Sequence, residues 1–70
     1  MPHLSMLEYT EMILEKVSFQ KELFRHELEK AITVLSISER AELKNYCYER
    51  FAQDHYQCLC QCFRSDNLNY

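Results

Sequence analysis

The chain contains no glycine among its 70 residues, and its single proline is Pro2. Glycine supplies the positive φ angles of tight hairpins and proline favours turn corners, so a β-rich domain without them needs unusual residues at every connection. Helix interiors disfavour both residues. The sequence therefore predicts an all-α fold. It also lacks the glycine that phosphate-binding loops, dinucleotide-binding turns and nucleophile elbows require.

Apolar residues at three-to-four spacing predict two helices in the first half of the chain, over residues 6–17 and 19–35. Ser5 is followed three positions later by Glu8, which is the pattern of a capping box at a helix start. Ser18 stands just before the second apolar stripe, so we expect it to be the N-cap of the second helix. The connection between the two helices is then a tight corner.

A third and longer helix is predicted over residues 39–63, with its weakest support after Asp54. Two caps are possible at its start, because Ser36 forms a capping box with Glu39 while Ser38 directly precedes Glu39. The sequence does not choose between them. Together the three helices indicate a small three-helix bundle with a long C-terminal helix.

The size of the chain, 70 residues and 8.5 kDa, is that of one small domain. Its hydrophobic content of 47% is too high for a disordered chain, so we expect it to fold. We place a single helical domain over residues 1–64 and a flexible C-terminal tail over residues 65–70, where the sequence is polar.

The charge pattern bears on partners and location. The net charge is −3 and the basic residues are interleaved with acids, which argues against nucleic acid as a partner. A helix-turn-helix would also point Glu39 and Glu42 toward phosphates. Apolar runs are too short for a membrane span, and Glu8 and Glu11 interrupt the region where a secretion signal needs an uncharged core. With four cysteines and no such signal, we expect a cytoplasmic protein with free thiols.

One cluster has metal-ligand chemistry, in the C-terminal part of the third predicted helix. His55, Cys58 and Cys62 share a helix face, whereas Cys60 points the opposite way. Cys47 lies roughly 16 Å from Cys58 along a continuous helix. No single helix can therefore complete a four-ligand site, and we expect no metal and no other cofactor. A metal- or redox-responsive small regulator that uses this cluster remains the alternative function.

Catalysis needs a nucleophile and a base in a pocket. Cys47 or Cys58 with His3, His26 or His55 has the residue types of a thiol nucleophile and its base. Residue types alone do not make a site, and a bundle this small has little room for a substrate pocket. We expect no enzymatic activity.

The third predicted helix has more apolar surface than packing against the first two helices requires. Leu43, Cys47 and Phe51 already form a stripe that can face the other helices. A second stripe, displaced by about 100°, consists of Tyr48, Ala52, Tyr56, Leu59 and Phe63. An apolar patch left in water marks a binding surface. We therefore predict a protein–protein interaction or self-association module, with itself as a homodimer or with another protein as the partner.

The alternative is that one chain buries both stripes. This requires the segment after Asp54 to fold back over the other helices. Replacing Tyr56 and Leu59 together by serine separates the two possibilities: an interface variant stays helical and becomes monomeric, whereas a core variant unfolds.

Overall fold

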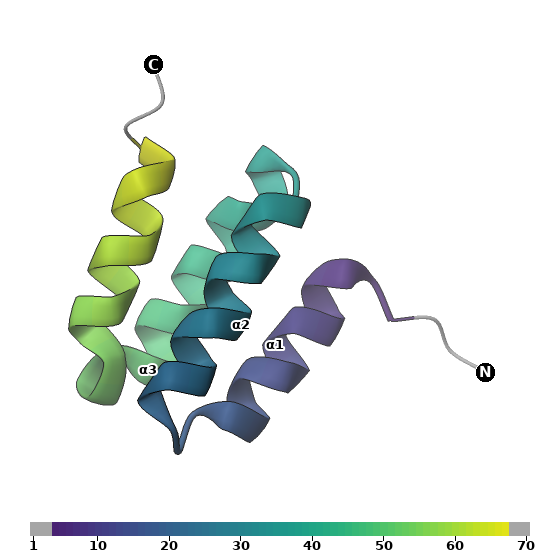
Figure 1. The fold of residues 1–70 in the computed structure, drawn as a ribbon. Coiled ribbons are helices and arrows are strands. Elements are labelled where there is room, and N and C mark those ends of the chain that lie inside the picture. The colour runs from purple at the N-terminus through teal and green to yellow at the C-terminus, as the bar shows by residue number, and fades with distance from the viewer. Residues whose placement is uncertain (1–3, 68–70) are drawn as a thin grey trace.

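The computed structural model describes the backbone of residues 4–67 and the side chains of residues 4–63. It contains α1 (Met6–Val17), α2 (Lys21–Val34) and α3 (Ile37–Asn67), and the described part has no strand (Figure 1). The predicted small all-α bundle of three helices with a long C-terminal helix is confirmed.

Two capping boxes fix helix starts. At α1 the Glu8 N–H donates to Ser5 Oγ at 3.0 Å, and the Ser5 N–H donates to Glu8 Oε1 at 3.1 Å. The same exchange joins Ser36 and Glu39 at α3, with distances of 2.9 and 3.3 Å. Of the two caps that the sequence allowed for the third helix, the structure therefore has the Ser36 box. Each box satisfies backbone donors that the first helical turn leaves without partners.

The corner between α1 and α2 differs from the prediction. Ser18 does not cap α2, because its hydroxyl donates backwards to the Glu15 carbonyl at 3.0 Å and closes the end of α1. The N-cap of α2 is Gln20, whose side chain makes no capping bond. The Gln20 N–H donates to the Val17 carbonyl at 3.0 Å, so the chain needs three residues to turn the corner. As a result α2 begins at Lys21.

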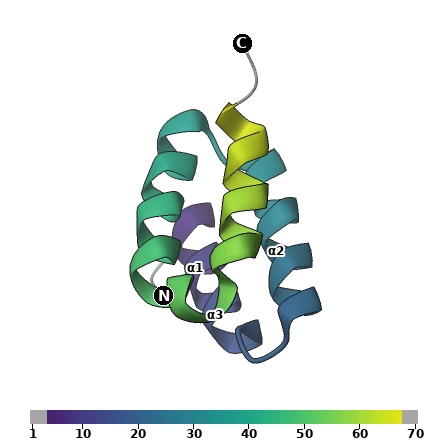
Figure 2. The ribbon, with the colours of Figure 1, turned by 90° about the vertical axis from the view of Figure 1, so that its left-hand side faces the viewer.

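The long helix α3 is sharply bent at His55, whose φ of −129° and ψ of 23° are not helical. The first arm (residues 37–54) runs along the bundle, and the second arm (residues 56–67) folds back beside it (Figures 1 and 2). The prediction of one continuous helix over residues 39–63 is therefore wrong at this point. The chain instead folds back after Asp54. The backbone stays helical through Asn67, three residues into the predicted tail; residues 68–70 lie outside the described part.

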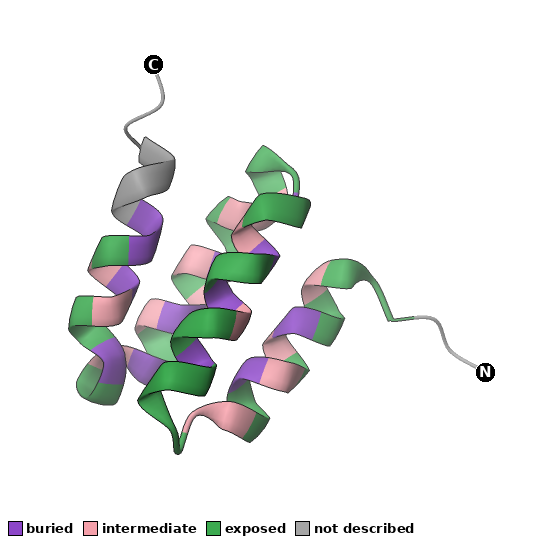
Figure 3. Cartoon of the chain, viewed as in Figure 1, coloured by how far each residue is buried: buried purple, intermediate pink, exposed green. Residues whose placement is uncertain are grey.

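The bend turns three helices into four packed rods. Figure 2 shows the first arm and α2 on opposite sides of the bundle, with the second arm in front between them and α1 behind. Stretches coloured as buried occur along each of the four rods (Figure 3). The core cluster consists of Leu14, Phe24, Leu28, Ala31, Leu35, Leu43, Cys47, Phe51, Leu59, Cys62 and Phe63. Members of this core come from all four rods, so the second arm is part of the bundle.

A polar contact joins α1 to the first arm of α3. The Arg50 guanidinium lies 3.0 Å from a Glu15 carboxylate oxygen and 5.2 Å from the centre of the Tyr46 ring. The Tyr46 hydroxyl donates to the same carboxylate. Burial, followed by this hydrogen bond, raises the pKa of Tyr46 to about 12. The phenol therefore stays protonated at neutral pH, and the contact serves to hold two helices together.

Candidate functional site

His55 is built into the bend. Its ring stacks on Phe24, with centroids 4.0 Å apart and planes 12° apart, and only 4% of the residue is exposed. Nε2 lies 2.8 Å from the Ser18 carbonyl oxygen, which can only accept, so this nitrogen carries the hydrogen. Nδ1 is buried and has no hydrogen-bond partner. His55 thus ties the start of the second arm to the corner between α1 and α2.

The cysteines of the predicted cluster separate onto two sides of the second arm. Cys58 and Cys62 lie one turn apart with their sulfurs 4.0 Å apart. Cys60 points to the first arm, where the Tyr48 hydroxyl donates to its sulfur at 3.5 Å; it is half-buried and not on an exposed polar side. Among the described residues, no three His, Cys, Asp or Glu side chains gather where they could hold one ion. The four predicted cluster residues therefore do not converge.

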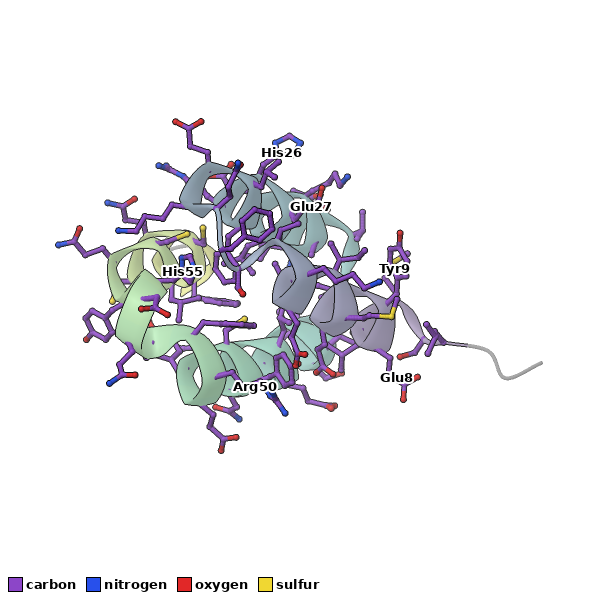
Figure 4. The ribbon with its side chains drawn as sticks, turned by 90° about the horizontal axis from the view of Figure 1, so that it is seen from below. Glu8, Tyr9, His26, Glu27, Arg50 and His55 are labelled. Carbon is purple, nitrogen blue, oxygen red and sulfur yellow. The ribbon has the colours of Figure 1, made fainter. Side chains whose placement is uncertain are left out.

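Burial makes three thiols, those of Cys47, Cys58 and Cys62, poor nucleophiles. It raises the pKa of Cys47 and of Cys62 to about 12, and it is also the main cause of a raised pKa at Cys58. A thiol in this state is protonated at neutral pH, whereas catalysis needs the thiolate. His26 is exposed and points away from the molecule (Figure 4), and His3 lies outside the described residues. The described part thus pairs no activated thiol with a base.

Metal removal is expected to leave the fold intact. Reduced, purified protein should hold no stoichiometric zinc, because a structural zinc site needs four converging ligands, and His55 is already bonded to Ser18. Metal analysis of the purified protein and far-ultraviolet circular dichroism before and after treatment with a chelator check this expectation. Loss of helix on chelation would contradict it and favour the metal-responsive alternative.

The predicted interaction face is split by the bend. Leu59 and Phe63 are 0% and 2% exposed, so the prediction of one continuous exposed face is wrong for these two residues. Tyr48 meets Tyr56 edge-on at 6.0 Å and lies 6.4 Å from Phe63, between ring centres. Tyr48 and Ala52 are half-buried, and Tyr56 alone is largely exposed, at 58%. Most of this face therefore closes the second arm onto the first, and a binding role for Tyr56 stays a prediction.

A different apolar surface is open, in a groove between α1 and α2. Figure 1 shows α1 leaning away from α2 toward its N-terminal end. The groove there has a volume of about 420 Å³. Eight residues from the two helices line it: Met6, Tyr9, Thr10, Ile13, Glu27, Lys30, Ala31 and Val34. We call this surface the α1–α2 groove.

The walls of the α1–α2 groove follow from helical spacing. Buried Thr10 and Ala31 line it from the core side, whereas Met6, Tyr9 and Val34 are 50–59% exposed. These exposed apolar residues sit beside the core stripe of their helix, which makes its apolar side wider than the core requires. Sequence analysis missed the groove because periodicity assigns Met6 to the apolar side of its helix without showing whether a neighbour covers that position.

The groove has a few polar features at defined places. Among the described residues, Glu27 and Lys30 are the charged ones that line it, and their side chains form a salt bridge of 3.5 Å on the α2 wall. Figure 4 shows Tyr9 and Glu27 on the same side of the molecule, one from α1 and one from α2. The site thus offers apolar contact area, one acid and one base. Apolar area with a polar margin is typical of protein-binding surfaces.

No protein-family model, curated protein or solved structure matches the chain. None of the described helices combines the length and the apolar character that crossing a membrane requires.

Proposed function

We propose that this protein is a non-catalytic interaction module of the cytoplasm that forms a homodimer through the α1–α2 groove. The observation that carries the proposal is the open apolar groove itself, bordered by three large apolar side chains that are half or more exposed. Contiguous exposed apolar surface with a polar margin is typical of protein-binding sites. Four free cysteines fit a reducing compartment.

A second copy of the chain is the occupant that the charges favour. Glu27 and Lys30 lie one helical turn apart on one wall of the groove. A two-fold axis across the groove sets two α2 helices antiparallel, so that Glu27 of each subunit faces Lys30 of the other. The same symmetry brings the exposed rim residues Met6 and Tyr9 of one subunit to the groove of the other. The surface carries an acid and a base, and it has both a groove and exposed rim residues that can fill a groove. It is therefore complementary to a second copy of itself.

Replacing Val34 by lysine is expected to raise the dissociation constant of the dimer by about 30-fold or more. Val34 lines the groove and is 59% exposed in the single chain, so lysine leaves the fold unchanged but places a charge in the interface. Losing an apolar contact and burying an unpaired lysine charge in an interface costs about 2 kcal/mol or more, which is about 30-fold in affinity. Size-exclusion chromatography with light scattering and sedimentation equilibrium measure the change.

The matched control is Ile37→Lys. Ile37 is also a large exposed apolar residue, at 77%, but it does not line the groove, so this variant should dimerise like the wild type. A wild type that stays monomeric at millimolar concentration, or a dimer that Val34→Lys leaves unchanged, shows the proposal to be wrong. A dimer that Tyr56→Ser disrupts instead places the interface on α3.

The proposed two-fold arrangement predicts a specific result for variants in which the charges of Glu27 and Lys30 are reversed. Glu27→Lys and Lys30→Glu chains each bring like charges together in a homodimer, so each alone should associate more weakly than the wild type. Mixed together, the two variants should form heterodimers, and the double variant with both changes should recover the homodimer. Failure of the mixed variants to pair means that no such two-fold contact exists.

A further inference from the structure

Two thiols are placed as a pair on the second arm of α3. Cys58 and Cys62 are one helical turn apart, and their sulfur atoms are separated by 4.0 Å. Both are free cysteines, Cys58 half-buried and Cys62 buried. Leu59 and Phe63, their helical neighbours, are buried in the core, so the turn that carries the sulfurs is fixed to the bundle.

This separation matches two sulfurs on one metal ion. Metal–thiolate bonds are about 2.3 Å for zinc, so two sulfurs on one ion are about 3.8 Å apart at a tetrahedral centre and about 4.6 Å apart at a linear one. The observed 4.0 Å lies between these limits. We propose that Cys58 and Cys62 form a two-thiolate binding site for one copper(I) ion.

Copper(I) is the ion that fits a site with two sulfurs and no third ligand. It is soft and is selected by thiolates. Zinc takes four ligands in structural sites, and the described residues do not bring a third one to the pair. Cys60 is turned toward Tyr48, and His55 Nε2 is bonded to the Ser18 carbonyl. A cation that accepts two soft ligands is therefore favoured over zinc.

The pair is reachable from the surface. Cys58 lines an open hollow of about 480 Å³, and Cys62 lines a neighbouring hollow of about 330 Å³. Arg25 of α2 and Gln61 of the second arm line both hollows, so the two hollows adjoin along one seam between these helices. The sulfurs of Cys58 and Cys62 lie at this seam. An ion can thus reach the thiols without unfolding of the helix.

Copper binding changes the charge at this seam. Binding exchanges two S–H bonds for two copper–sulfur bonds, releases two protons to water and leaves the oxidation state of copper at +1. The two thiolates and the ion together carry one negative charge. Arg25 lines both hollows and is bonded at 3.0 Å to Glu29, which lines the hollow of Cys62, so one positive and one negative side chain lie beside the pair. The guanidinium stabilises a negatively charged thiolate complex, and the Glu29 carboxylate opposes part of this effect.

Competition for copper(I) tests the site. The reduced protein is titrated with copper(I), kept reduced by ascorbate, against the chromogenic chelator bicinchoninate. The wild type should bind one copper per chain, and Cys60→Ser, whose sulfur faces the other way, should bind it equally well. Cys58→Ser should bind copper more than about 100-fold more weakly, because changes next to a metal ligand already cost about 10–100-fold.

Several outcomes overturn the proposal. Equal affinity of the wild type and Cys58→Ser means that the pair is not the site, and equal losses in Cys58→Ser and Cys60→Ser mean non-specific thiol binding. One copper per two chains in native mass spectrometry means a site shared between chains. Circular dichroism shows that each variant is folded, and Cys58→Ala replaces Cys58→Ser if serine disturbs the helix. Val34→Lys should bind copper like the wild type, so this result is independent of the proposed dimer.

Discussion

Replacing Leu59 by alanine is expected to lower the free energy of unfolding by about 2–5 kcal/mol, the usual loss for a buried leucine. Leu59 is 0% exposed and belongs to the core cluster that joins the second arm of α3 to the other rods. Alanine removes this apolar contact and leaves a cavity that a close-packed core fills only in part. Urea unfolding followed by circular dichroism measures the change.

The neighbouring variant Tyr56→Ser is the control. Tyr56 is 58% exposed and meets the Tyr48 ring edge-on, so its loss should cost only about 1 kcal/mol. Replacing Tyr56 and Leu59 together should destabilise the protein mainly through Leu59. If Leu59→Ala has the stability of the wild type, the second arm does not pack on the core and the bent arrangement is wrong.

Replacing Phe24 by alanine is expected to have an even larger effect, about 3–5 kcal/mol. Phe24 is fully buried; it meets Phe51 edge-on at 5.0 Å and stacks on His55 at 4.0 Å, between ring centres. The change therefore removes core volume and two aromatic contacts at once. A domain of 70 residues has a total stability of about 3.5–10 kcal/mol, so the substitution should remove a large fraction of the stability and lower the urea midpoint markedly.

Two further variants make the Phe24 result interpretable. Phe24→Leu keeps most of the volume but loses the stacking on His55, so it should fold with an intermediate loss of stability. Leu23→Ala changes an adjacent residue that is 41% exposed and should cost clearly less than Phe24→Ala. Equal losses for Leu23→Ala and Phe24→Ala contradict the central position of Phe24.

The parts of the fold that the sequence predicts are those set by near neighbours in the chain. Ser5 and Glu8 are three residues apart, as are Ser36 and Glu39, and both capping boxes form. The limits predicted for α1 are those observed. Ser18 shows where local reasoning fails, because a serine between two helices can bond backwards as well as forwards, and here it closes α1.

The bend was not predictable from local signals. Its partners are remote: His55 bonds to the carbonyl of Ser18, 37 positions earlier, and stacks on Phe24 of α2. Neither glycine nor proline marks the place. Helical periodicity places Leu59 and Phe63 on one face of the helix. This face is buried only because the chain reverses direction at the bend that precedes it. The α1–α2 groove was missed for a related reason, since the sequence does not show how far two helices diverge.

The backbone angles at His55 have a consequence for exchange between chains. A φ of −129° is negative and requires no glycine, so the bend is held by contacts and not by a special residue. Straightened, the 31 residues of α3 form a rod of about 46 Å. This exceeds the 37 Å of the longest molecular dimension. In the straight form the second arm projects beyond its own chain and uncovers the surface of α2 on which it packs in the bent form. Every other copy of the chain has the same α2 surface. Domain swapping between two such chains restores each core contact of the arm and removes only the bend.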